Sequence, residues 1–175
     1  TFSITNNSNP GLFSGTPTIS SAGVLSYTPA ANAIGSAVLT FQLQDSGGTA
    51  NSGVDTSGTQ LTTVTVNAVN DPPSFTVGPN QSVPEDSVAQ TVNPWATAIS
   101  PGPADESGQT VSFNITGNTN AALFSAGPAV SPTGVLTYTP AANAVGVATI
   151  SLTLQDNGGG TDTSAAQNFT ITLTA

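Results

Sequence analysis

The sequence predicts an all-β protein made of tandem antiparallel β-sandwiches, with about seven strands in each complete repeat. Three observations lead to this prediction. Apolar and polar residues alternate in segments such as AVLTFQLQD and ATISLTLQ, which is the period-two pattern of half-buried strands. Gly and Pro interrupt the chain often enough to leave no room for a helix of ordinary length. Much of the sequence also occurs twice.

The repeat emerges when the chain is aligned on itself. Residues 2–48 match residues 113–159 without gaps, and 27 of these 47 positions are identical. After a loop that is four residues longer in the first copy, residues 60–68 match residues 167–175. We therefore interpret 69–175 as one complete repeat with a VNDPP linker at 69–73. Residues 1–68 are an incomplete β-sandwich repeat that lacks the counterpart of the N-terminal strands at 69–110.

The incomplete first copy leaves two interpretations open. In one, the chain is a window from a longer array of repeats. In the other, the missing N-terminal strands come from a neighbouring molecule, an exchange that would build a filament.

Within the complete repeat, strands are expected at 74–77, 95–99, 110–116, 122–125, 135–139, 148–155 and 167–174. The lone Trp, Trp95, falls in the second of these strands and is expected to fill the core. Stacking of Trp95 on a sugar is the alternative. The other expected core residues are Phe113, Phe124, Leu136, Tyr138, Leu152 and Leu154.

All the charged side chains of the sequence are acidic. The chain has no Lys, Arg or His, and its nine carboxylates give a formal net charge of −9. Without basic groups to meet phosphate, binding to nucleic acid or to anionic membranes is excluded. Cys is also absent, so disulfides cannot form, and without Lys, Arg or His no salt bridge between side chains can form. The negative charges must therefore be spread out in water or neutralised by cations from solution.

The same absences predict that the chain is not an enzyme. Catalytic triads, thiolates and Schiff-base nucleophiles need His, Cys or Lys. A glycosidase needs two carboxylates across a cleft, whereas Asp105 and Glu106 are adjacent in one loop. Zinc and copper sites lack their usual ligands. A composition rich in Thr, Ser, Gly, Asn and Pro is typical of exported proteins and favours an extracellular location.

The string VTVNAVNDPP at 64–73 resembles the junction between tandem cadherin-like and immunoglobulin-like repeats of large bacterial extracellular adhesins. In cadherins, this junction carries an Asp-x-Asn-Asp-x-Pro motif whose oxygens bind calcium between domains. Asn70 and Asp71 match the second half of the motif, whereas Ala68 replaces its first acid. PED at 84–86 resembles the Pro-Glu-Asn element of a cadherin domain. The resemblance covers the whole chain and implies cadherin-like or immunoglobulin-like sandwiches on a bacterial cell surface, with calcium as the cofactor.

The expected order of strands predicts at which end of the sandwich each carboxylate lies. In an antiparallel sandwich, loops alternate between the two ends, so several acidic loops should gather where the linker joins the repeat, here called the linker end. The residues expected there as calcium ligands are Asn70, Asp71, Asp105, Glu106, Asp156 and Asp162. Glu85 and Asp86 are expected at the opposite end, facing the next junction. An oxygen-only set suits calcium; the alternative is that these are scattered, solvated loop acids.

These observations favour a structural repeat of an extracellular adhesin stalk or surface filament. Calcium at the junction would neutralise the crowded acids and stiffen the array, and the Pro72–Pro73 pair would add rigidity. The expected partners are neighbouring copies of the same repeat, in the same chain or in a filament. A glycan-binding or ice-binding sandwich is the alternative function, although most of the few aromatic residues fit the core.

Overall fold

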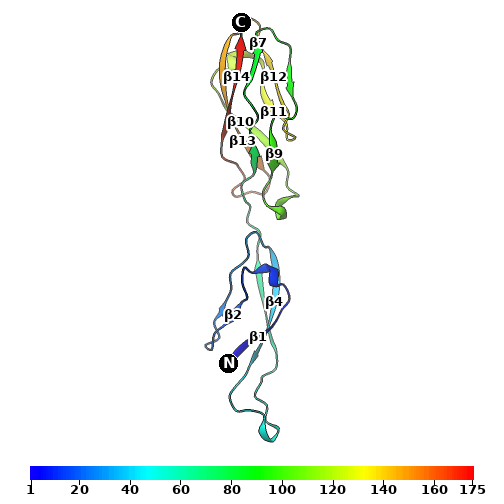
Figure 1. The fold of residues 1–175 in the computed structure, drawn as a ribbon, viewed down its shortest axis with the longest axis vertical. Helices are drawn as coiled ribbons and strands as arrows, with labels where there is room; N and C mark the ends of the chain where they lie inside the picture. Colours follow the sequence, from blue (N-terminus) through cyan, green and yellow to red (C-terminus); the bar gives the residue numbers. More distant parts are fainter. The chain divides into compact units, whose positions relative to one another are not determined.

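A computed structural model describes all 175 residues, and the chain divides into two compact units (Figure 1). Unit 1 comprises Thr1–Ala68 and unit 2 comprises Val69–Ala175. The only helices are single short turns, and none has the length and hydropathy of a membrane span.

Unit 2 is all-β and contains nine strands. These are β6 (Ser74–Thr76), β7 (Gln81–Pro84), β8 (Gln90–Val92), β9 (Thr97–Ser100), β10 (Val111–Asn118), β11 (Phe124–Val130), β12 (Leu136–Pro140), β13 (Gly146–Asp156) and β14 (Gln167–Thr174). The 3-10 turn η3 (Ala104–Glu106) precedes β10, and the 3-10 turn η4 (Ala121–Leu123) precedes β11.

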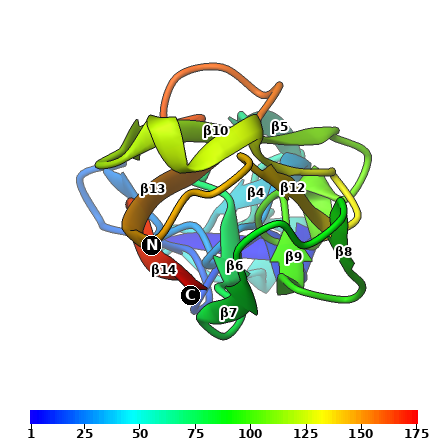
Figure 2. The same ribbon diagram turned by 90° about the horizontal axis from the view of Figure 1, so that it is seen from above.

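Two main sheets enclose the core of unit 2. One has the strand order β10-β13-β14-β7 and the other the order β11-β12-β8, while β6 pairs with β9. All pairs are antiparallel except β14 with β7, which run parallel. Figure 2, an end-on view, shows β7 near β14 and places β8 on the side of β12. The prediction of an antiparallel β-sandwich is thus confirmed.

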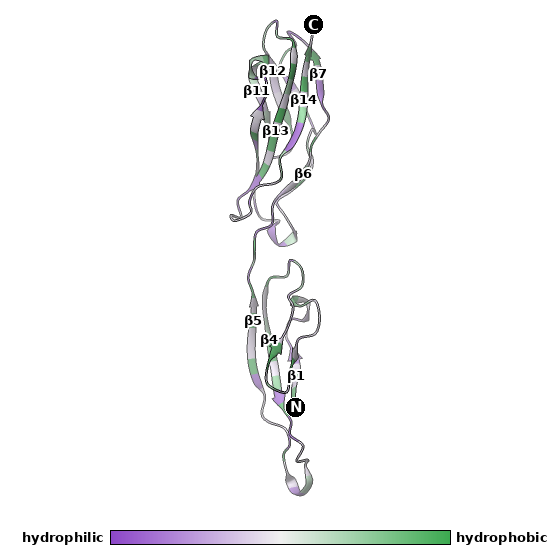
Figure 3. Ribbon diagram, turned by 90° about the vertical axis from the view of Figure 1, so that its left-hand side faces the viewer, coloured by the Kyte–Doolittle hydropathy of each residue, from purple (hydrophilic) through white to green (hydrophobic).

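The central strand β13 shows why this sequence forms a sheet. Alternate residues from Ala148 to Leu154 are fully buried, as the period-two pattern predicts. On one side Leu154 lies opposite Phe113 of β10, and on the other Ile150 lies opposite Phe169 of β14. In Figure 3, hydrophobic colour therefore concentrates along β13 and β14.

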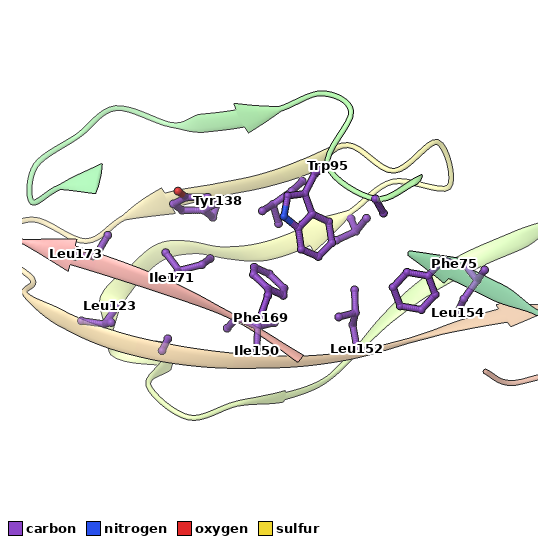
Figure 4. Packing of buried hydrophobic residues seen from close by; sticks show 14 residues of the cluster. Phe75, Trp95, Leu123, Tyr138, Ile150, Leu152, Leu154, Phe169, Ile171 and Leu173 are labelled. Carbon is purple, nitrogen blue, oxygen red and sulfur yellow. The ribbon is translucent and has the colours of Figure 1, made fainter. Parts of the chain in front are cut away.

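Trp95 lies in the core, as predicted, but not in a strand. Its side chain is 2% exposed, packs on Phe169 with ring centroids 4.4 Å apart, and donates its indole N–H to the Pro79 carbonyl at 3.0 Å. Figure 4 shows this ring among Phe169, Leu152 and Tyr138. Burial removes Trp95 as a platform for sugar stacking. The strand expected at 95–99 begins only at Thr97, because residues 93–96 form a bend that turns the indole inward.

The remaining core predictions are confirmed, although two of the residues are only half-buried. Leu136, Tyr138, Leu152 and Leu154 are fully buried, whereas Phe113 and Phe124 are half-buried and pack against the same cluster. Two short strands, β7 and β8, fall in segments where no strand was expected. The strand expected at 122–125 is the η4 turn followed by the start of β11.

Unit 1 contains a smaller set of strands. The strands β1 (Phe2–Asn7), β4 (Gly35–Leu43) and β5 (Gln60–Val66) form one sheet, and β2 (Thr18–Ile19) pairs with β3 (Leu25–Ser26). The turns η1 (Pro10–Leu12) and η2 (Ala50–Ser52) complete it. Its core is small: Leu12, Phe13, Ala37, Leu39 and Val64.

Candidate functional site

The side chain of Asn70 joins the linker of unit 2 to a loop more than eighty residues later. Its amide nitrogen donates to the two carboxylate oxygens of Asp156 at 3.2 and 3.4 Å and to the Thr161 carbonyl at 3.1 Å. Its amide oxygen accepts the side-chain N–H of Gln109 at 2.8 Å. Asn70 therefore fixes the linker to the loops before β10 and between β13 and β14.

Glu106 makes the second attachment. It ends the η3 turn, is 5% exposed, and accepts the backbone N–H of Asp71 on Oε1 at 2.7 Å. Its other oxygen, Oε2, is buried and has no hydrogen-bond partner, and the same holds for Oε1 of Gln109. A buried carboxylate needs compensation for its lost hydration. The chain has no Lys, Arg or His that could supply it.

Two glycines leave room for these side chains. A Cβ atom at Gly102 would lie 1.7 Å from Oε2 of Glu106, and a Cβ atom at Gly158 would lie 1.7 Å from Oδ1 of Asn70. Only a residue without a side chain allows the backbone to approach so closely. Both loops are therefore shaped around the polar groups of this cluster.

Asp156 and Asp162 have different surroundings. Asp156 is 6% exposed and accepts the Gly158 N–H at 2.8 Å in addition to the Asn70 amide. Asp162 accepts from the Gln155 amide at 3.0 Å and the Thr163 hydroxyl at 2.8 Å. These two hydrogen bonds lower the pKa of Asp162, the Gln155 bond most. The backbones of the two acids are joined by an Asp156 N–H to Asp162 carbonyl bond of 2.9 Å.

The structure separates the expected ligands into two groups. Hydrogen bonds connect Asn70, Asp71, Glu106 and Asp156. The carboxylate of Asp162 instead accepts from Gln155 of β13 and from Thr163. Asp105 is exposed beside Glu106 on η3. No three acidic side chains lie together in the arrangement of metal ligands.

Sequence reasoning missed two members of the cluster, Gln109 and the carbonyl of Thr161. Neither carries a signal that the sequence displays, because a lone Gln in a loop and a backbone oxygen are both unremarkable without the fold.

The other expected pair lies at the far end of β14. The backbone N–H of Glu85 donates to the carbonyl of Thr174, the last residue of that strand, at 2.6 Å. Asp86 has a positive φ of 58° and accepts the backbone N–H of Asn143 at 2.8 Å. The carboxylate of Asp86 therefore holds the turn between β12 and β13.

No family model matches the sequence, and no curated protein matches it either. Among solved structures, mouse protocadherin-24 EC1-3 superposes with a TM-score of 0.54 over 99% of this chain, at 16% identity. The fold is cadherin-like. The alignment spans 58% of that mouse chain. Chicken VE-cadherin EC1-2 matches with a TM-score of 0.45 at 21% identity, over 91% of this chain and 78% of that chain.

The oxygen-rich cluster at the linker end can be tested for its fit to calcium. Calcium takes about six to eight oxygen ligands from carboxylates, amide oxygens and carbonyls. The cluster offers only oxygens as ligands, including the two buried ones on Glu106 and Gln109 that have no partner. The chemistry of the donor set therefore fits a hard cation. The negative charge of Glu106 and Asp156, both buried, favours one as well.

Proposed function

We propose that this chain is a non-enzymatic structural repeat of an extracellular array, such as the stalk of a bacterial adhesin or a surface filament. The observation that carries the proposal is the repetition of one cadherin-like unit along the chain, at 27 identities in 47 aligned positions. A catalytic constellation is missing from the composition, which has no His, Cys, Lys or Arg. The partners in this proposal are further copies of the repeat.

We further propose that calcium binds at the linker end of unit 2. Glu106, Asp71 and Asp156 would supply carboxylate oxygens, and Gln109 an amide oxygen. The support is the buried, unpartnered Oε2 of Glu106 beside a segment that Asn70 already holds in place. When bound, the ion supplies positive charge that the side chains of this chain lack.

The remaining acidic residues have lesser roles in this proposal. Asp105 and Asp162 add negative charge on the two loops that carry Glu106 and Asp156. Glu85 and Asp86 form the start of a second site at the far end, facing the next junction. By fixing the linker to the loops, calcium would convert a flexible array into a stiff one.

Thermal melting of the full chain in calcium and in EDTA tests the calcium proposal. Trp95 is the only Trp, so its fluorescence reports on unit 2 alone. Calcium is expected to raise the melting temperature of unit 2 by several degrees. In Glu106→Gln the increase should be largely lost, whereas in the neighbouring Asp105→Asn most of it should persist. Equal melting of the wild-type chain in calcium and EDTA would overturn the proposal.

Stiffening is a separate measurement. A donor and an acceptor dye placed on unit 1 and unit 2 should show a narrower distance distribution in calcium than in EDTA. If calcium raises the melting temperature but leaves the distribution unchanged, the ion stabilises the unit and the stiffening role is wrong.

A further inference from the structure

Asn157 and Gly158 form the only Asn-Gly step of the sequence, and they lie in the loop between β13 and β14. Such a step is prone to self-modification, because the backbone nitrogen after the Asn can attack the side-chain amide, and a Gly leaves that nitrogen unhindered. The product is a cyclic succinimide, which water opens to an aspartyl or an isoaspartyl residue. This loop is therefore a candidate site of covalent change.

The fold places a base on the attacking nitrogen. The backbone N–H of Gly158 donates to Oδ1 of Asp156 at 2.8 Å. The carboxylate of Asp156 is buried, and the side-chain amide of Asn70 holds it in place. A carboxylate in hydrogen-bond contact with a proton is in position to take that proton as a general base. The loop thus keeps base and nucleophile together, which a disordered chain does not.

A second hydrogen bond polarises the group under attack. The backbone N–H of Thr110 donates to Oδ1 of Asn157 at 2.9 Å. Negative charge builds up on this oxygen when the neighbouring carbon is attacked, and a fixed backbone N–H stabilises that charge in the manner of an oxyanion hole. The side chain of Asn157 is also exposed, so its amide nitrogen has a path into water.

The loop keeps its shape without an Asn at this position. In unit 1, Ser46 stands at the counterpart of Asn157. There Asp45 accepts the N–H of Gly47 at 2.7 Å, which repeats the contact made by Gly158. Asn157 therefore adds a reactive amide to a loop that forms equally well around Ser.

We propose that Asn157 is a site of self-catalysed deamidation, which the fold of unit 2 accelerates. The nitrogen of Gly158 forms a bond to Cγ of Asn157, and its proton passes to the carboxylate of Asp156. The Cγ–Nδ2 bond then breaks, and the amide nitrogen takes up that proton and leaves as ammonia. Water opens the succinimide at either carbonyl and leaves a new carboxylate at position 157. The reaction consumes only water and proceeds without calcium, so it does not depend on the proposed function.

The modified loop loosens the linker end. Gly158 packs so closely on the linker that a Cβ atom there would lie 1.7 Å from Oδ1 of Asn70. An isoaspartyl residue lengthens the main chain by a methylene directly before Gly158 and displaces this glycine from Asn70. An aspartyl residue instead adds negative charge next to Asp156, and the chain has no basic side chain to offset it. With either product, the attachment of Asn70 to the loop has a limited lifetime.

Ageing of the full chain at neutral pH in EDTA tests the proposal. Peptide mapping by mass spectrometry follows the exchange of NH2 for OH at Asn157, and isoaspartyl-specific methylation identifies the product. The reference is a synthetic peptide of residues 150–163, which carries the same Asn-Gly step without the fold. Conversion in the full chain should be at least about tenfold faster than in the peptide. The exposed Asn51, which Ser52 follows, should remain unchanged over the same period. Equal or slower conversion in the full chain would overturn the proposal.

Asn157→Ser is the matched variant for the consequence, since it introduces the residue of the first copy. On ageing, the melting temperature of unit 2, followed by Trp95 fluorescence, should fall by about 4 °C or more in the wild type. It should stay constant in Asn157→Ser. If the aged wild type is converted at position 157 but melts as the fresh chain does, the loosening of the linker end is wrong. An equal fall in Asn157→Ser would assign the loss of stability to another residue and overturn the role of Asn157.

Discussion

The side-chain amide of Asn70 lies within hydrogen-bonding distance of both carboxylate oxygens of Asp156, at 3.2 and 3.4 Å. Asn70 precedes β6, the first strand of unit 2, and Asp156 is the last residue of β13. This contact closes the unit at its linker end.

Removal of the amide should destabilise unit 2. In Asn70→Ala, the buried carboxylate of Asp156 and the amide of Gln109 lose a partner, and an unsatisfied buried polar group costs about 1 to 3 kcal/mol. Denaturant unfolding followed by Trp95 fluorescence measures the change. Asn168→Ala, at an exposed position on β14, should change the free energy of unfolding by less than about 0.5 kcal/mol. Equal stability of Asn70→Ala and the wild type would contradict the prediction.

A side chain at Gly78 should disrupt the packing of Trp95. A Cβ atom there would lie 2.3 Å from the backbone oxygen of Trp95 and 2.6 Å from its ring, so Gly78→Ala forces the backbone to move. Overpacking of this kind costs about 1 to 3 kcal/mol. Gly108→Ala is the control, because no atom lies within 4 Å of its Cβ position. Melting curves and the Trp95 emission maximum of both variants test the prediction, and an unshifted maximum in Gly78→Ala would speak against it.

Removal of one hydroxyl should stabilise unit 2. The hydroxyl of Tyr138 is buried without a hydrogen-bond partner, and burial raises the pKa of Tyr138. Tyr138→Phe removes the desolvation cost, and we expect a gain of up to about 1 kcal/mol. Tyr27→Phe, at the exposed counterpart, should have no effect. A loss of stability in Tyr138→Phe would show that the hydroxyl has a partner in solution.

Tyr138 should also make the stability of unit 2 sensitive to alkali. Because the folded pKa of Tyr138 is raised, the folded state holds its proton longer than the unfolded state does. The contribution of Tyr138 to the free energy of unfolding is constant below its unfolded pKa of about 10, and it declines as the pH rises toward the folded pKa. Denaturant unfolding at several alkaline pH values should show a decline that Tyr138→Phe reduces.

Acid should weaken the loop between β13 and β14. Hydrogen bonds from Gln155 and Thr163 lower the folded pKa of Asp162, so the stabilisation is present above the unfolded pKa of about 4. It is lost as the pH falls through the folded value. The protection of the loop amides, measured as the ratio of the intrinsic to the observed exchange rate, should therefore fall below about pH 4 in the wild type. In Asp162→Asn this protection should already be weaker at neutral pH and change less with acid.

The sequence predicted the long elements of the fold better than the short ones. The alternation in 148–155 and 167–174 identified β13 and β14, since each alternate residue is buried against the opposite sheet. The strands β7 and β8 have only four and three residues, too few to display a period. They form because β14 and β12 offer them edges, and such tertiary pairing leaves no local signal.

The candidate site, too, could be predicted only in part. The order of strands indicated that the linker and two acidic loops share one end, and Asn70, Asp71, Glu106 and Asp156 are joined there by hydrogen bonds. The sequence could not decide between Asp105 and its neighbour Glu106, because the η3 turn alone determines which carboxylate faces inward. Calcium binding by this cluster stays a prediction.

The parallel pairing of β7 with β14 determines how unit 2 responds to tension. The chain runs into β7 at Gln81 and leaves β14 at Thr174, and these residues lie at opposite ends of a ladder of four pairs. A pull on the two ends of the unit slides the strands past each other, so the hydrogen bonds of the ladder are loaded in shear and must break together. The unit therefore resists extension through a short mechanical clamp that joins the beginning of its sequence to the end.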